Sequence, residues 1–184
     1  MDYYQDIRVL ADVETPEQVL MAQVFLHLHK VLQRAASNRI GISFPAVKVT
    51  LGDRIRLHGS HEELAALQQS AWEQGLKDYI SCSGIAKVPE GASWRYVKRV
   101  QVKSSAERLR RRSVSKGWLS ESEALQRISN ANEQRSDLPY LMIKSGSNGN
   151  AYPIFIEHGP IGAVPVDGSF SSYGLSATKT VPWF

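Results

Sequence analysis

Apolar and polar positions change period several times along the first 90 residues, and each change predicts an element. Residues 3–10 are typical of a strand. Apolar residues then recur at 20, 21, 24, 25, 28, 31, 32 and 35, which predicts a long amphipathic helix. Thr15 is the predicted N-cap of this helix, and Pro16 is its predicted first residue.

The pattern then returns to strands and gives a second helix. Residues 40–49 and 54–58 predict two strands, with Gly52 and Asp53 in the turn between them. Ser60 and Glu63 have the spacing of a capping box and predict a helix, and residues 80–88 predict a fourth strand. The order β-α-β-β-α-β predicts a ferredoxin-like domain over residues 1–92.

The second half predicts a smaller α+β domain, residues 93–184, after a linker at 89–93. Residues 99–103 alternate as a strand, and Ser104 with Glu107 predicts the start of an arginine-rich helix that reaches Lys116. Another short helix begins after Ser120, and residues 140–144 and 152–157 flank an Asn-Gly turn as a β-hairpin. The predicted fold class of the whole chain is therefore α+β.

Positive charge is concentrated in one segment. The 184-residue chain carries 22 basic and 18 acidic residues, a net charge of +4. Residues 95–116 alone hold nine basic residues and one acidic residue. A run of arginines by itself is more often a solvated helix face. Here a strand that presents Arg99, Gln101 and Lys103 on one face precedes it, which favours nucleic-acid binding.

Composition excludes several classes of site. The single cysteine, Cys82, allows neither an intramolecular disulfide nor a four-thiolate zinc site. The acidic residues are dispersed or stand at helix starts, which argues against a two-metal nuclease. The N-terminus lacks the features of a signal peptide, and no apolar run approaches the ~20 residues of a membrane span. We expect a cytoplasmic protein without a metal or other cofactor and without membrane association.

Chemistry without a metal is still open to a protein that cleaves RNA. The RNA 2′-hydroxyl is a built-in nucleophile that needs positioning and a base. Histidine suits the base because its ordinary pKa is about 6.5. His29 lies at the edge of the apolar stripe of the first helix, and taken alone it would be a surface residue. Ser145 and Ser147 precede the hairpin turn and taken alone are ordinary turn serines.

Motifs along the full length resemble those of the type I-F CRISPR-associated repeat-RNA endoribonucleases. The match is specific because the motifs occur in the family's order and spacing. They are Met1-Asp2, Asp6-Ile7-Arg8, Leu28-His29, residues 39–45 (RIGISFP), 99–101 (RVQ), 103–104 (KS), 107–112 (ERLRRR), 137–139 (DLP), 158–160 (HGP), 173–176 (YGLS) and 181–184 (VPWF).

The resemblance implies a function and a set of site residues. Members bind the stem-loop of a CRISPR repeat, cleave at its 3′ base without metal, leave a 2′,3′-cyclic phosphate and stay on the mature crRNA within a surveillance complex of other subunits. By the same resemblance, His29 is the expected general base, and Ser145 holds the reacting nucleotide, with Ser147 as a second serine nearby. Tyr173 lies beside the histidine in a hydrogen-bonding or orienting role. The implied RNA-binding residues are Arg99, Gln101, Lys103, Arg108, Arg111, Arg112, Ser115, Lys116 and Tyr152.

This chain departs from the family pattern at two positions, and two alternative functions remain open. The family helix can carry two further basic residues where this chain has Ser115 and Lys116, which puts the tightness of hairpin binding in doubt. Tyr152 stands where the family has phenylalanine, and it keeps the stacking ring. A non-catalytic hairpin-binding subunit is the main alternative, although it would need neither His29 nor Ser145 nor Tyr173. A DNA-binding regulator is a more distant one, because no helix-turn-helix pattern is present.

Overall fold

A computed structural model describes residues 1–11, 13–101, 106–128, 137–144 and 149–184. Within them the chain is α+β, with antiparallel sheets and four helices. By packing it divides into two compact units, residues 1–100 with 138–184 and residues 101–137. The predicted division into two domains, residues 1–92 and 93–184, stays a prediction.

The first sheet is built from the N-terminal half. Its strands β1 (Tyr3–Val9), β2 (Gly41–Ser43), β3 (Arg54–Gly59) and β4 (Ile80–Cys82) lie in the order β2-β3-β1-β4, and β5 (Ala86–Lys87) pairs with β1. All of these pairings are antiparallel. The long strand predicted at 40–49 is wrong beyond Ser43, because Pro45 lacks the N–H that would continue the ladder. The strand predicted at 80–88 is likewise two short strands, β4 and β5.

Two helices pack on this sheet. Helix α1 (Glu17–Arg34) buries the predicted apolar stripe, including Leu20, Phe25 and Leu28. The predicted cap is wrong by one residue: Pro16, with ψ 146°, is the N-cap in place of Thr15. Helix α2 (His61–Gln69) begins with the predicted capping box of Ser60 and Glu63, which is confirmed by both hydrogen bonds.

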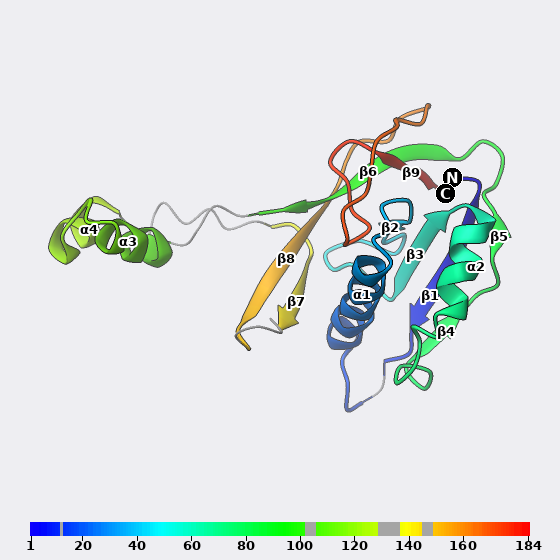
Figure 1. Cartoon of the computed structure of the whole chain (residues 1–184), viewed down its shortest axis with the longest axis horizontal. Helices are drawn as coiled ribbons and strands as arrows, with labels where there is room; N and C mark the ends of the chain where they lie inside the picture. Colours follow the sequence, from blue (N-terminus) through cyan, green and yellow to red (C-terminus); the bar gives the residue numbers. More distant parts are fainter. Residues whose placement is uncertain (12, 102–105, 129–136, 145–148) are drawn as a thin grey trace. The chain divides into compact units, whose positions relative to one another are not determined.

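The second sheet has the strand order β7-β8-β6-β9. Strand β6 (Ser93–Val100) pairs with both β8 (Ala151–His158) and β9 (Thr180–Trp183), and β7 (Tyr140–Lys144) pairs antiparallel with β8 as the predicted hairpin. Of the strand predicted at 99–103, Arg99 and Val100 lie in β6, which begins earlier and ends at Val100, and residues 102–103 lie outside the described residues. Strand β9 was not predicted. Helix α1 contacts β7 as well as β1 and β3, so one hydrophobic core joins the two sheets (Figure 1).

The chain termini lie side by side on the first sheet (Figure 1). Arg56 of β3 is 6% exposed and forms an ion pair with Asp6 at 2.6 Å. Its guanidinium also lies 3.9 Å from the Phe184 ring centroid and 4.7 Å from that of Tyr4, and it donates a hydrogen bond to the Phe184 backbone oxygen. This buried cation with its ion-pair, hydrogen-bond and aromatic partners fixes the C-terminal residues against β1.

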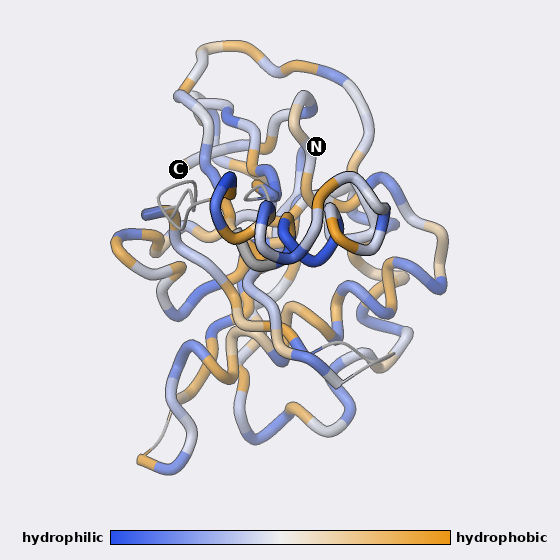
Figure 2. Tube along the Cα trace, turned by 90° about the vertical axis from the view of Figure 1, so that its left-hand side faces the viewer, coloured by the Kyte–Doolittle hydropathy of each residue, from blue (hydrophilic) through white to orange (hydrophobic). Residues whose placement is uncertain are grey.

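The unit of residues 101–137 contains two helices, α3 (Ala106–Ser115) and α4 (Glu121–Arg127). Helix α4 begins with the predicted capping box of Ser120 and Glu123, which is confirmed. The half-buried residues of α3, among them Leu109 and Val114, alternate with an exposed set. In the colouring of Figure 2 these two helices are mostly hydrophilic, with interspersed hydrophobic positions.

Candidate active site

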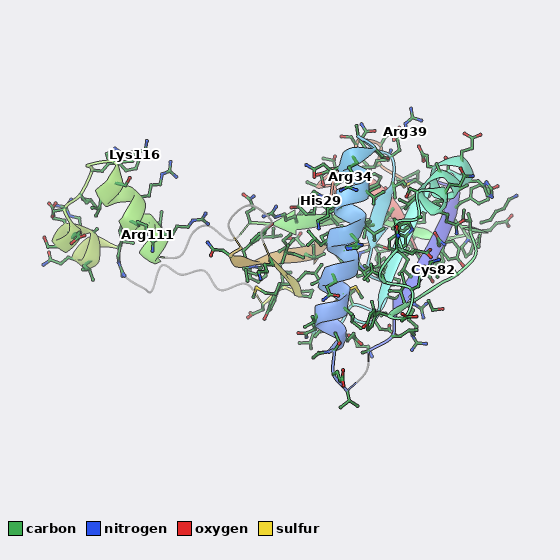
Figure 3. All side chains as sticks on the ribbon, turned by 60° about the horizontal axis from the view of Figure 1, so that its bottom comes forward. His29, Arg34, Arg39, Cys82, Arg111 and Lys116 are labelled. Atoms are coloured by element: carbon green, nitrogen blue, oxygen red, sulfur yellow. The ribbon has the colours of Figure 1, made fainter. Side chains whose placement is uncertain are left out.

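The candidate active site begins with His29 in the second half of α1 (Figure 3). Its Nδ1 lies 2.9 Å from the backbone oxygen of Ser172, a residue 143 positions away in the sequence. A carbonyl oxygen can only accept a hydrogen bond, so Nδ1 carries a proton and donates it. In the neutral ring the lone pair is therefore on Nε2, which is the atom able to take a proton from a substrate.

The His29 ring is also held on its face. The Tyr173 ring is stacked on it with a centroid separation of 3.8 Å and an interplanar angle of 4°. Phe25, one turn earlier on α1, has its ring centroid 5.8 Å from that of Tyr173 at an angle of 17°. Stacking on one side and the Ser172 hydrogen bond on the edge together fix both the tilt and the tautomer of the imidazole.

The loop that carries Ser172 and Tyr173 is anchored at several points. Ile42 of β2 donates a backbone hydrogen bond to the Gly174 oxygen at 2.7 Å, and Ser176 donates one to the Val97 oxygen at 2.9 Å. Gly174 has φ +67°, and a Cβ atom there would lie 2.5 Å from Ile42. Only glycine fits this combination of left-handed backbone and close packing.

Tyr173 connects His29 to two further predicted site residues. Its side chain is hydrogen-bonded to Tyr152 of β8, and the Arg99 guanidinium lies 5.6 Å from its ring centroid. Burial and the Tyr152 hydrogen bond raise the pKa of Tyr173, while the charge of Arg99 opposes this. The phenol is therefore neutral at physiological pH and can orient the site without acting as a base.

Arg99 is the cation of this cluster. It stands near the end of β6, paired with Ile156 of β8. Its Nε is buried and finds no hydrogen-bond partner among the described residues. A buried donor without a partner is costly, so this guanidinium is poised for an acceptor that a ligand could supply.

The structure thus places four of the predicted residues together, namely His29, Tyr173, Tyr152 and Arg99. Gln101 is exposed and belongs to the unit of residues 101–137. Ser145, Ser147 and Lys103 lie outside the described residues. The predicted residues of α3 and of the position just after it, which include Arg111 and Lys116 (Figure 3), are all exposed: Arg108, Arg111, Arg112, Ser115 and Lys116.

Sequence reasoning missed the contributions of Ser172, Phe25 and Gly174. Ser172 acts through its backbone oxygen, which no side-chain pattern can indicate. Phe25 matched the apolar stripe and was assigned only to the core. Gly174 belongs to the family motif at residues 173–176. A glycine at that position could have indicated a backbone with positive φ, which the structure has.

Two other histidines of this unit, His58 and His158, have lowered pKa values. His58 is fully buried, with Nε2 2.8 Å from the Ser43 hydroxyl, and burial is the main cause that lowers its pKa to about 3. Burial likewise lowers the pKa of His158 to about 4. Among the described residues, no three His, Cys, Asp or Glu side chains gather as metal ligands. In the same part of the chain, no helix has the length and hydropathy needed to cross a bilayer.

Comparison with known proteins assigns the chain to a family. The sequence profile of a family described as CRISPR-associated protein (Cas_Csy4) matches residues 4–184, almost the whole chain. This chain belongs to the Csy4 family. The resemblance found in the sequence motifs is therefore confirmed.

Two curated relatives of this Csy4-family chain align over the full length of both sequences. One, from Escherichia coli (strain UTI89 / UPEC), is 53% identical over 184 residues. The other, from Pseudomonas aeruginosa (strain UCBPP-PA14), is 42% identical over 187 residues. Both carry the name CRISPR-associated endonuclease Cas6/Csy4.

Proposed function

We propose that this protein is the endoribonuclease that matures CRISPR transcripts in its host. It binds the stem-loop of each repeat, cleaves the RNA at the 3′ base of the hairpin and stays on the mature crRNA. Membership of the Csy4 family and the endonuclease names of the two relatives support the activity. The observation that carries the chemistry is the His29 imidazole, whose Nδ1 donates to the Ser172 oxygen and leaves Nε2 for a substrate proton.

The proposed reaction is a transesterification without metal. The 2′-hydroxyl oxygen of the nucleotide before the cut attacks the adjacent phosphorus, and His29 Nε2 takes its proton. The bond from phosphorus to the 5′-oxygen of the next nucleotide breaks, and that oxygen leaves as a hydroxyl after taking a proton from solvent, to which His29 then returns its own proton. The products are a 2′,3′-cyclic phosphate and a free 5′-hydroxyl, so no water is consumed.

Other residues of the site position the reactants. We assign Ser145 and Ser147 to the reacting nucleotide, by their family motif. Tyr173 orients His29 through the ring stack, which is a positioning role because the phenol stays protonated. Tyr152, hydrogen-bonded to Tyr173, would stack on the last base pair of the stem.

The RNA-binding surface has two parts in this proposal. Arg99, with its unpartnered buried Nε, reads a base at the foot of the stem together with Gln101 and Lys103. The exposed residues of α3 and Lys116 just after it bind the phosphates of the stem, the basic ones among them through their positive charge. They are Arg108, Arg111, Arg112, Ser115 and Lys116.

The finer architecture and the partners follow from the same assignment. We propose a ferredoxin-like domain over residues 1–92, supported by the strand order β2-β3-β1-β4 with antiparallel pairing throughout. Residues 93–184 would then form the RNA-recognition domain with its arginine-rich helix and hairpin. The mature complex would join the other subunits of a type I-F surveillance complex in the cytoplasm, where the transcript is processed.

The test is cleavage of the host's repeat hairpin in excess EDTA, with binding measured in parallel. Wild type should cut under these conditions. His29→Ala should bind with nearly unchanged affinity and lose at least about a hundredfold in single-turnover rate, since general base catalysis contributes about 10²–10⁴-fold. His27→Ala, two residues away on the same helix, is the matched control and should cut like wild type.

Each failure has a distinct meaning. A wild-type protein that binds the hairpin and never cuts it would be a retained, non-catalytic binding subunit. Normal cutting by His29→Ala would leave the activity in place and move the base to another residue. A protein that cuts only before EDTA is added would contradict the metal-independent mechanism.

A further inference from the structure

Trp118 is the only aromatic residue between positions 101 and 137, and it lies directly after the arginine-rich helix. Its side chain is 65% exposed, although tryptophan is among the residues that gain most from burial. The unit it belongs to offers mainly charged and polar neighbours. An exposed ring in this position needs either a structural reason or a ligand.

Backbone hydrogen bonds at the end of α3 fix the position of the Trp118 main chain, from which the indole projects. Trp118 N–H donates to the Ser113 oxygen at 2.9 Å, and Gly117 N–H donates to the Val114 oxygen at 2.9 Å. Gly117 has φ +68°, so the helix ends in a Schellman motif. In that motif an apolar side chain at the position of Trp118 commonly packs back onto the last turn of the helix.

That packing is incomplete here. Ser113 offers no apolar surface to the indole. Arg112, one residue earlier, has its guanidinium 6.0 Å from the Trp118 ring centroid. The helix end therefore presents an oriented, exposed aromatic face next to a cation.

An aromatic face beside a guanidinium matches the chemistry of one nucleotide. The base can stack on the indole, and the phosphate can pair with the arginine. Bases inside a duplex are already stacked on their neighbours, and the last base pair of the stem is assigned above to Tyr152, so the ligand must be an unpaired nucleotide. We propose that Trp118 is a stacking platform for one unpaired nucleotide of the bound RNA, with Arg112 binding its phosphate. The inference rests on the proposed function, because it requires that the chain binds an RNA hairpin.

The charge around Trp118 favours RNA over a protein partner. Exposed basic residues lie on the same helix, at positions 108, 111, 112 and 116. A polyanion is attracted to such a surface by its charge. An apolar protein surface that bound here would have to remove water from the basic side chains, which costs free energy.

The experiment measures the Kd of the host's repeat hairpin for wild type and three variants. Trp118→Ala should raise the Kd by about 5- to 50-fold, and Trp118→Phe, which keeps a ring, should stay within about threefold of wild type. Leu125→Ala on α4 is the matched control, because Leu125 is also 65% exposed in the same unit, and it should change the Kd less than about twofold. Circular dichroism checks that each variant retains its helices.

Hairpins that lack a single base identify the nucleotide. The wild-type protein is tested on a series in which each unpaired position is made abasic in turn. At one position, removing the base should weaken hairpin binding by the wild-type protein as much as the Trp118→Ala substitution does. The same abasic hairpin should bind to the Trp118→Ala variant no more weakly than the intact hairpin does. The single-turnover cleavage rate at saturating protein should be the same for both proteins.

Three results would overturn the proposal. The first is a Trp118→Ala variant that binds the hairpin with the wild-type Kd. The second is a Trp118→Phe variant that binds the hairpin as weakly as Trp118→Ala does. The third is that, at every position, the losses of affinity from base removal and from Trp118→Ala add together. In all three the wild type still binds and cuts the hairpin, so the proposed function survives. A wild type that does not bind the hairpin overturns both.

Discussion

At the residue scale, the candidate base is defined by two contacts that act on different parts of one ring. The Ser172 oxygen fixes the proton on Nδ1 of His29, and the Tyr173 ring fixes the plane of the imidazole. The first contact leaves Nε2 as the nitrogen that can accept a proton, and the second holds the ring in one orientation. Proton transfer is steeply sensitive to the position of the accepting atom.

The stack predicts that the ring of Tyr173 matters more than its hydroxyl. Tyr173→Phe keeps the face that lies 3.8 Å from His29 and should keep the single-turnover cleavage rate within about fivefold. Tyr173→Leu removes the flat ring and should slow cleavage by about ten- to a hundredfold, with hairpin binding changed much less. Equal rates for the two variants would show that the stack does not position His29.

At the scale of elements, α3 separates its residues into two faces. Half-buried Leu109, Arg110 and Val114 form one face, and Arg110 donates a hydrogen bond to the Ile128 oxygen after α4 at 2.8 Å. The exposed face carries Arg108, Arg111, Arg112, Ser115 and Lys116, at spacings that bring them together on one side. Ser115 interrupts that side with an uncharged residue.

Ser115→Arg should therefore strengthen RNA binding. One more phosphate contact is expected to steepen the plot of log affinity against log salt by roughly 0.7 to 0.9. Gln126→Arg adds the same charge to exposed α4 and is the matched control for net charge alone. Titrations at four salt concentrations measure both slopes. Equal slopes for the two variants would show that position 115 does not face the RNA.

At the scale of the whole molecule, each sheet of the larger unit contains a histidine whose pKa is lowered by burial, which is complete for His58 and partial for His158. His58 lies on β3 in the first sheet, and His158 ends β8 in the second. The pKa of each is lowered, to about 3 and about 4, chiefly by burial. In the unfolded chain both would titrate near about 6.5, so the unfolded state binds protons first as the pH falls.

Stability should accordingly be full above about pH 6.5 and decrease as the pH falls toward the folded-state pKa values. For the fully buried His58 alone, the decrease in unfolding free energy from pH 7 to pH 5 should be on the order of 2 kcal/mol. Urea unfolding at a series of pH values measures it. His58→Gln can still hydrogen-bond Ser43 but does not titrate, so its pH dependence should be shallower. A variant with an unchanged slope would contradict this origin of the acid sensitivity.

Sequence patterns predicted helix starts correctly where the capping contacts join residues close together in the chain. The capping boxes at Ser60 and Ser120 each involve residues three apart, and both are confirmed. The cap of α1 was misassigned by one residue, and the strand at 40–49 was overextended past Pro45. Strand β9 was missed because Thr180–Trp183 is too short for a periodicity, and only its pairing with β6 defines it.

The sequence by itself determined the family, the α+β class, the amphipathic face of α1 and the concentration of positive charge on α3, because motifs, periodicity and charge are properties of neighbouring residues. It also predicted His29, Tyr173, Tyr152 and Arg99 as site residues, through the resemblance to the family. Only the tertiary structure decided how they meet: the 171–176 loop returns to α1 across 143 residues and presents a backbone oxygen to the histidine. That contact uses an atom every residue has, so its position is set by packing and not by residue type.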